Sequence, residues 1–219
     1  MTDFSANASA HLFGLCPACR LRSDLCLCAS IPQLQTRSKI VVVIHSRELK
    51  KASNTARLCL AALPNSELRV QGCPSGALDL GGLVTPERQT LILFPHSSNP
   101  PLSHKTAALI TKPVTLIVPD GTWTQARKIA GHVSQLPGAI RIALPPSAPS
   151  RYRLRIASGS KNGSHIGAGV KLCTLEAIAR ALGFIEPAPN GQEIQHALEK
   201  LLDFLVERSL LMRKRGAIR

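Results

Sequence analysis

The sequence predicts an α/β fold built on a mainly parallel sheet with helices on both sides. Continuous apolar runs rich in β-branched residues recur at 39–45, 89–95, 114–118 and 139–144, as expected of strands covered on both faces. Helical patterns separate these runs, and such alternation is typical of parallel sheets with crossover connections. The 219 residues are 44% hydrophobic, which favours one main domain with small appendages.

The domain boundaries follow from these patterns. We expect an N-terminal segment over 1–36, a main domain over 37–190, and a C-terminal amphipathic helix with a basic tail over 191–219, packed on the main domain. The apolar stripe of that last helix reads as core or as a dimer contact.

The charge is strongly basic. Lys and Arg number 27 against 13 Asp and Glu, a formal net charge of +14. Such a field attracts a polyanion, nucleic acid above all, although the charge could also serve only solubility. The N-terminus lacks the basic start and apolar core of a signal peptide, and the apolar runs are too short to span a membrane. We therefore expect a cytoplasmic protein with no membrane partner and no obligate protein partner.

Four of the seven cysteines are clustered near the N-terminus. Without a secretion signal, a disulfide framework is disfavoured, whereas four adjacent thiolates can complete the tetrahedral shell of a structural zinc ion. The second pair is spaced more tightly than in common zinc ribbons, and redox chemistry or chance clustering are the alternatives. The predicted zinc ligands are Cys16, Cys19, Cys26 and Cys28.

The first predicted strand, 39–45, ends at His45, and Ser46 is placed to cap a helix that runs to about Leu63. On that helix Glu48, Lys51 and Asn54 would share one face close to His45. This face could contact a ligand or could simply be solvated.

The strand at 114–118 runs into Asp120-Gly-Thr-Trp123 before a helix expected over 124–133. This turn lies at the carboxyl edge of the predicted sheet, where α/β proteins bind ligands. Asp120 could act in chemistry, cap the following helix, or do both. Trp123, the single tryptophan of the chain, could belong to the site or to the core.

After the strand at 139–144 comes a basic stretch whose arginines surround the only tyrosine: Arg151, Tyr152, Arg153 and Arg155. This pattern suits phosphate binding and base stacking, with a solvated edge strand as the alternative. The glycine-rich segment 158–169 could be a lid or a linker and lacks a Walker motif. Thr174 is expected to cap a helix that carries Glu176 in its first turn and stops at Gly183.

Several of these residues form motifs in a fixed order. They are Cys16-x-x-Cys19, Cys26-Leu-Cys28 followed by Ile31-Pro32, His45-x-x-Glu48-x-x-Lys51-x-x-Asn54-Thr55, Leu93-Phe94-Pro95, Asp120-Gly-Thr-Trp123 and Thr174-x-Glu176-Ala. The ordered set covers most of the chain and resembles the DTW-domain family, the tRNA-uridine aminocarboxypropyltransferases. The resemblance implies a fold related to the SPOUT methyltransferases, with a trefoil knot that binds S-adenosylmethionine.

The resemblance also implies a reaction. The 3-amino-3-carboxypropyl group of S-adenosylmethionine would pass to N3 of a tRNA uridine, forming acp3U and releasing methylthioadenosine. Because N3 is protonated at neutral pH, Asp120 is the predicted general base. The alternatives are an RNA methyltransferase that uses the same cofactor and a noncatalytic zinc-containing RNA-binding protein.

The remaining predicted site residues divide between the cofactor and the tRNA. Cofactor contacts are expected from Leu93, Phe94, Pro95, Thr122, Trp123, Leu144, Thr174 and Glu176. RNA contacts are expected from His45, Lys51, Asn54, Arg151, Tyr152, Arg153 and Arg155.

Overall fold

The computed structural model describes residues 14–51, 54–73, 76–95, 101–146, 149–155 and 172–216. Its centre is a five-stranded sheet in the order β2-β1-β4-β3-β5, and every pairing in it is parallel. The strands are β1 (Lys39–His45), β2 (Ser66–Gln71), β3 (Gln89–Leu93), β4 (Val114–Asp120) and β5 (Ile140–Ile142). The predicted α/β class with a parallel sheet is therefore confirmed.

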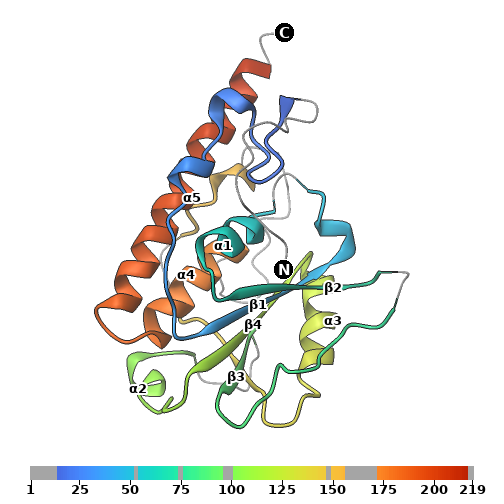
Figure 1. Cartoon of the computed structure of the whole chain (residues 1–219), viewed down its shortest axis with the longest axis vertical. Helices are drawn as coiled ribbons and strands as arrows, with labels where there is room; N and C mark the ends of the chain where they lie inside the picture. Colours follow the sequence, from blue (N-terminus) through green and yellow to red (C-terminus); the bar gives the residue numbers. More distant parts are fainter. Residues whose placement is uncertain are drawn as a thin grey trace.

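Helices cover both faces of the sheet (Figure 1). Ile40, Val42 and Ile44 of β1 point into a larger core shared with the N-terminal cysteine segment, α1 (Ala56–Ala62), α4 (Thr174–Ile185) and α5 (Asn190–Gly216). Val41 and Val43 point the other way, into a smaller core under α3 (Trp123–Val133). Burial on both faces explains why the strand sequence is continuously apolar.

Short elements complete the described chain. They are the 3-10 turns η2 (Ser23–Leu25), η3 (Cys28–Ser30), η4 (Ser46–Glu48) and η5 (Arg153–Arg155), and the short helix α2 (His104–Ala107). Among the described residues, no helix combines the length and apolar character needed to cross a membrane.

The chain order makes the carboxyl ends of β1 and β4 a binding position. The chain leaves β1 through α1 towards β2, and it leaves β4 through α3 towards β5, on the opposite side of the sheet. The two connections diverge between the adjacent strand ends, and this is the position at which open α/β sheets typically bind ligands. His45 and Asp120 end these two strands.

Several predicted elements differ from the structure. In place of the helix expected from Ser46 to Leu63, the described residues form η4 and a separate helix, α1. The side chain of Asn54 accepts a hydrogen bond from the backbone N–H of Ala56 at 3.0 Å, a local contact that competes with a continuous helix. The edge strand β2 was missed because its sequence, Ser-Glu-Leu-Arg-Val-Gln, is only half-buried.

The boundaries of the other helices shift as well. α3 begins at Trp123, and Thr174 is the first residue of α4, preceded by Cys173 at the cap position. α4 continues through Gly183 to Ile185, and α5 runs from Asn190 to Gly216, so it includes part of the predicted basic tail. β5 is shorter than the predicted 139–144.

The junction between α4 and α5 yields a stability prediction. A Cβ added at Gly191 would lie 2.8 Å from the carbonyl oxygen of Glu186 and 2.9 Å from that of Leu182. Because these are backbone atoms, Gly191→Ala should destabilise the fold by about 1–3 kcal/mol, measured by urea unfolding. The matched control is Gly183→Ala, whose closest atom is the flexible tip of Gln195, so a smaller change is expected. Equal losses would contradict the backbone clash.

Candidate active site

The carboxylate of Asp120 is held by two side chains from distant parts of the chain. Asp120 continues the face of β4 that carries Leu116 and Val118, so it points towards α1 and α4. Asn54 donates its Nδ2–H to Oδ2 at 2.5 Å, and the Thr174 hydroxyl donates to Oδ1 at 2.5 Å. Asp120 itself is 8% exposed. One donor on each oxygen fixes the plane of the carboxylate.

The two donors are themselves held in place. Asn54 accepts the N–H of Ala56, and the hydroxyl of its neighbour Thr55 accepts the N–H of Leu175 at 3.2 Å. The start of α4 is thereby joined to the start of α1 directly beside Asp120. A carboxylate offers about four acceptor positions, so these two bonds leave capacity for a proton from a ligand.

The Asp120 carboxylate does not cap α3, the helix that follows it. Thr122 caps α3: its hydroxyl accepts the N–H of Gln125 at 3.4 Å, and the Gln125 side chain accepts the N–H of Thr122 at 2.7 Å. This reciprocal capping box satisfies the helix start. Capping, the alternative role for Asp120, is therefore taken by Thr122.

Trp123 lies at the surface rather than in the core. Its side chain is 40% exposed, and its ring faces Phe94 with centroids 5.0 Å apart and an interplanar angle of 30°. Phe94 follows β3, and Pro95 beside it is exposed. Phe94 is buried in the smaller core under α3, so this aromatic pair lies at the carboxyl ends of β3 and β4, on the sheet face opposite the one to which the Asp120 side chain points. Leu144, which follows β5, is half-buried further along the same edge.

Leu144 also borders a cavity of about 350 Å³, whose lining includes Phe184, Arg180 and Glu199. A second cavity, of about 310 Å³, lies at the opposite, amino edge of the sheet. The predicted glycine-rich lid or linker, 158–169, falls outside the described residues.

The predicted RNA-contact residues after β1 are close to this edge. His45 ends β1, its Nδ1 accepts the N–H of Arg47 at 3.2 Å, and a Cβ on Gly121 would lie 3.6 Å from its Cβ. Lys51 is exposed and pairs with Glu48 at 2.7 Å. Asn54, in contrast, turns to Asp120.

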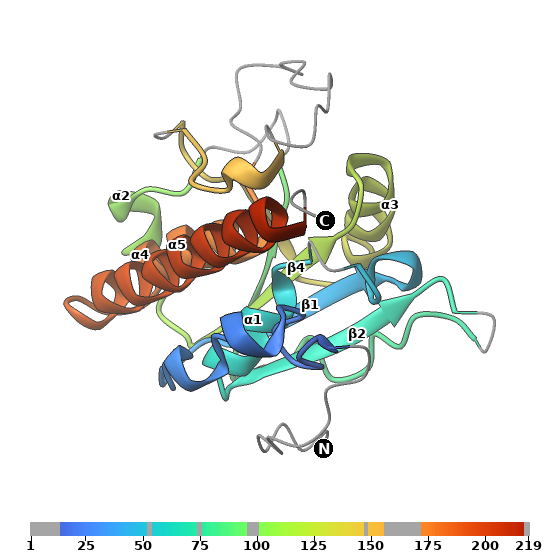
Figure 2. The ribbon, with the colours of Figure 1, turned by 90° about the horizontal axis from the view of Figure 1, so that it is seen from above.

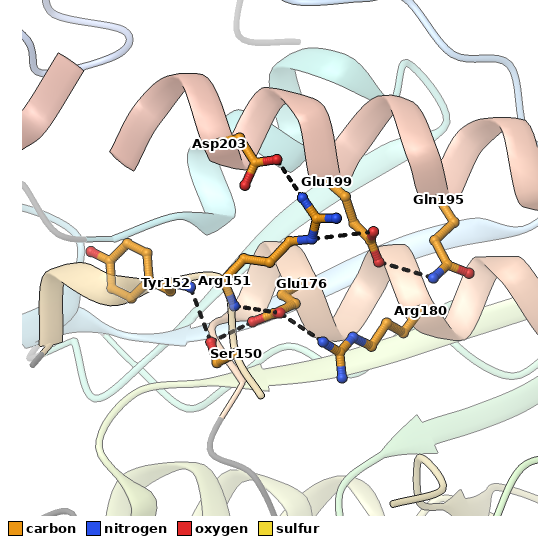
Figure 3. Close-up of polar contacts among 8 residues, drawn as sticks. All are labelled: Ser150, Arg151, Tyr152, Glu176, Arg180, Gln195, Glu199 and Asp203. Atoms are coloured by element: carbon orange, nitrogen blue, oxygen red, sulfur yellow. Dashed lines mark hydrogen bonds and ion pairs between the residues drawn. The ribbon is translucent and has the colours of Figure 1, made fainter. Parts of the chain in front are cut away.

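Glu176 is completely buried and bound by protein donors (Figure 3). Its carboxylate accepts the Ser150 hydroxyl at 2.6 Å, the backbone N–H of Arg151 at 3.0 Å and the Arg180 guanidinium at 2.8 Å. Glu176 therefore clamps the segment around residue 150 onto α4. The sequence could not show this, because the hydroxyl and the N–H come from an irregular segment about 25 residues earlier.

A large stability effect is expected at this clamp. Glu176→Ala would remove the buried carboxylate that accepts hydrogen bonds from a hydroxyl, an N–H and the Arg180 guanidinium, so we expect a loss of about 3–5 kcal/mol, measured by chemical unfolding. The control is Asp203→Ala, which removes an exposed partner of Arg151 and should cost less than about 1 kcal/mol. Similar losses at both positions would argue against the clamp.

The basic stretch 151–155 does not form one surface. Arg151 pairs with Glu199 at 3.6 Å and with Asp203, both on α5. Tyr152 is 5% exposed and packs in the larger core, so stacking on a base would require it to leave that core. Arg153 is exposed on η5; the side chain of Arg155 is outside the described set.

The four N-terminal cysteines converge in an arrangement that could hold a metal ion. Their sulfur atoms all lie within 4.8 Å of one another, with Cys16 to Cys28 at 3.5 Å and Cys19 to Cys26 at 3.7 Å. Tetrahedral zinc with Zn–S bonds of about 2.3 Å requires S···S separations of about 3.8 Å. The cluster therefore fits that geometry.

The thiols of this cluster differ in acidity. Burial opposes ionisation of Cys16, but backbone hydrogen bonds from Cys19 and Ala18 prevail and lower its pKa to about 7. Burial raises the pKa of Cys19 and of Cys28. A bound cation would favour the thiolate form of all the ligands.

The cysteine segment is anchored to two helices. Arg57 of α1 donates to the carbonyl of Cys19 at 3.0 Å and to that of Lys51 at 3.1 Å. Arg208 of α5 donates to the carbonyls of Leu25 and Cys26. Arg57 thus connects the cysteine cluster to the chain segment that carries Asn54.

Comparison with known proteins gives consistent matches. The model of the DTW domain family matches residues 14–210. The tRNA-uridine aminocarboxypropyltransferase A of Arabidopsis thaliana is 29% identical over 90% of this chain and 81% of its own length. The tRNA-uridine aminocarboxypropyltransferase 2 of Macaca fascicularis is 26% identical over 90% of this chain, which spans 65% of that relative.

Among solved structures, a SAM-dependent rRNA:acp-transferase from Vulcanisaeta distributa aligns with a TM-score of 0.46 and 20% identity, over 81% of this chain and 80% of that one.

Proposed function

The chain belongs to the DTW-domain family, and from this premise we propose that it transfers the 3-amino-3-carboxypropyl group of S-adenosylmethionine to N3 of a uridine in tRNA. Its similarity to tRNA-uridine aminocarboxypropyltransferases supports this class of transferase. The observation that carries the proposal is Asp120, a buried carboxylate at the carboxyl end of β4 beside β1, oriented by Asn54 and Thr174.

Asp120 acts as the general base in this proposal. N3 of uridine loses its proton to the carboxylate and forms a bond to the γ-carbon of the methionine moiety, while the bond from that carbon to sulfur breaks. The electron pair of the broken bond neutralises the sulfonium, and methylthioadenosine leaves. Because attack must be in line with the leaving sulfur, the site has to present the γ-carbon, and not the methyl group, to the base.

The aromatic pair and the strand ends provide the surroundings of the cofactor. We assign Leu93, Phe94, Pro95, Thr122, Trp123 and Leu144 to this role, because they lie at the carboxyl edge near Asp120 or beside it along the sheet. Thr174 and Asn54 act through Asp120 as positioning residues. Glu176 acts further away, by holding the segment at 150–151.

The four cysteines support a structural zinc ion. Cys16, Cys19, Cys26 and Cys28 would supply four thiolates, and a tetrathiolate shell leaves no open position for catalysis. The ion would stabilise the N-terminal segment. Arg57 would in turn stabilise the segment that bears Asn54, because it donates to the carbonyls of both Cys19 and Lys51.

Other parts of the sequence-based prediction stay proposals. The trefoil knot is one, because the connection between β5 and α4 includes residues 156–171, which the structure does not describe. We also propose a cytoplasmic location, no obligate protein partner, and domain boundaries at residues 36 and 190.

Nucleoside mass spectrometry tests the proposed reaction. Purified protein is incubated with tRNA and S-adenosylmethionine, and both the nucleosides and the sulfur product are analysed. Aminocarboxypropyluridine together with methylthioadenosine is the expected result. A methylated nucleoside with S-adenosylhomocysteine would establish methyl transfer instead, and unmodified tRNA with intact cofactor would reject both reactions.

A further inference from the structure

We propose that tRNA docks on the α3 basic surface, formed by Arg47, Lys50 and Lys51 after β1 and by Arg127 and Lys128 of α3. The inference rests on the proposed function, because it locates where the RNA substrate of that reaction binds. It differs from the sequence-based prediction, which placed much of the RNA contact on 151–155.

The α3 basic surface has an uncompensated positive charge. The segments 45–51 and 123–133 contain five Lys and Arg side chains and one carboxylate, Glu48. The side chain of Glu48 is 13% exposed and pairs with Lys51. Arg47, Lys50, Arg127 and Lys128 are exposed, and within the described ranges no carboxylate forms an ion pair with them. Such cations are available to phosphates.

The helix geometry places Arg127 beside the aromatic pair. Ala126, Ile129, Ala130 and Val133 face the smaller core, so the opposite side of α3 faces solvent. Trp123 and Arg127 are four residues apart and lie on the same side of the helix. A guanidinium for a phosphate and an exposed indole for a base are therefore neighbours, a combination suited to single-stranded or loop RNA.

The segment after β1 extends this surface. Gly121 lies against His45, and the side chain of Gln71 at the end of β2 meets His132 of α3 at 2.6 Å. Figure 2 shows the segment after β1 beside α3 at one end of the sheet. The cations of both segments therefore lie at the carboxyl edge of the sheet, where β4 ends at Asp120. Because the Asp120 side chain points to the face of α1 and α4, a nucleotide of RNA bound on α3 would reach the carboxylate across this edge.

The opposite side of the molecule is less suited to a polyanion. α5 carries four carboxylates, Glu193, Glu199, Asp203 and Glu207, interspersed with five Lys and Arg residues, and it packs on the sheet face opposite α3. Arg151 is already paired with Glu199 and Asp203 (Figure 3). RNA approaching α5 would meet carboxylates among its cations, whereas α3 carries Arg127 and Lys128 and no carboxylate, so the repulsion of a polyanion is smaller at the α3 basic surface.

A matched pair of double variants tests this surface. Arg127→Gln with Lys128→Gln removes two cations from α3. Arg37→Gln with Lys105→Gln removes the same two residue types from exposed positions before β1 and on α2, at the amino edge. Binding of unmodified tRNA is measured by fluorescence anisotropy at several salt concentrations, after thermal unfolding and metal analysis confirm that both variants are folded like wild type.

The double variant Arg127→Gln/Lys128→Gln should weaken tRNA binding by about tenfold at moderate salt. The magnitude of the slope of log K against log salt should fall by about 1.8, because two phosphate contacts are lost. The control double variant, Arg37→Gln/Lys105→Gln, should change the affinity for tRNA by less than about twofold. Equal weakening of tRNA binding by both double variants would overturn the proposed docking surface. So would an Arg127→Gln/Lys128→Gln variant that binds tRNA as tightly as wild type but no longer binds anionic vesicles. Failure of the wild-type protein to form acp3U is a different result, which rejects the proposed reaction and not the measured docking site.

Discussion

Asp120→Asn should abolish aminocarboxypropyl transfer while leaving the fold, metal content and tRNA affinity close to wild type. The amide cannot take the N3 proton, and general-base catalysis typically contributes about a hundredfold to ten-thousandfold in rate. One amide oxygen remains to accept a hydrogen bond from Asn54 or Thr174, the two donors that now hold the carboxylate. The measurement is acp3U formed per enzyme under single-turnover conditions.

Thr174→Val serves as the graded control for this experiment. It keeps the carboxylate but removes the hydroxyl donor to Oδ1, so activity should fall less than in Asp120→Asn. The expected order is wild type, then Thr174→Val, then Asp120→Asn. Rates of acp3U formation at the wild-type level in Asp120→Asn would refute the general-base role, whereas a loss of tRNA affinity or metal would point to a structural role instead.

Cys19→Ser should abolish binding of the proposed zinc ion and strongly destabilise the protein. Cys19 is completely buried in the cysteine cluster, and structural zinc sites in small peptides contribute about 10–16 kcal/mol of apparent binding free energy. Even a small part of that value is large against a domain stability of about 5–15 kcal/mol. The measurements are elemental analysis of the purified protein and its thermal midpoint.

Cys73→Ser is the matched control, because Cys73 is half-buried and lies outside the cluster. It should keep full metal content and a midpoint near wild type. Wild-type protein stripped by a chelator should behave like Cys19→Ser, and its acp3U formation should also fall, since Arg57 connects Cys19 to the segment before Asn54. A stoichiometric ion in Cys19→Ser would contradict this ligand assignment.

The sheet and the cysteine cluster could be predicted because their signals are local. Continuous β-branched runs indicate strands buried on both sides, and both faces of β1 are indeed covered. The four cysteines lie within 13 residues of sequence, from Cys16 to Cys28, so short turns suffice to bring them together. β2 escaped prediction because an edge strand with a polar sequence carries little of this signal.

The sequence by itself determined the parallel α/β sheet, the clustering of four cysteines, and the position of Asp120 at a strand end, because these follow from periodicity and short spacing. Only the tertiary structure decided that Asn54 and Thr174, 66 and 54 residues away, orient Asp120. The tertiary structure also buries Glu176 and Tyr152 and pairs Arg151 with α5. It leaves Trp123, Arg127 and Lys128 exposed. The physical reason is that side-chain partners between distant segments depend on how α1, α3, α4 and α5 pack around the sheet, and local patterns carry no record of that packing.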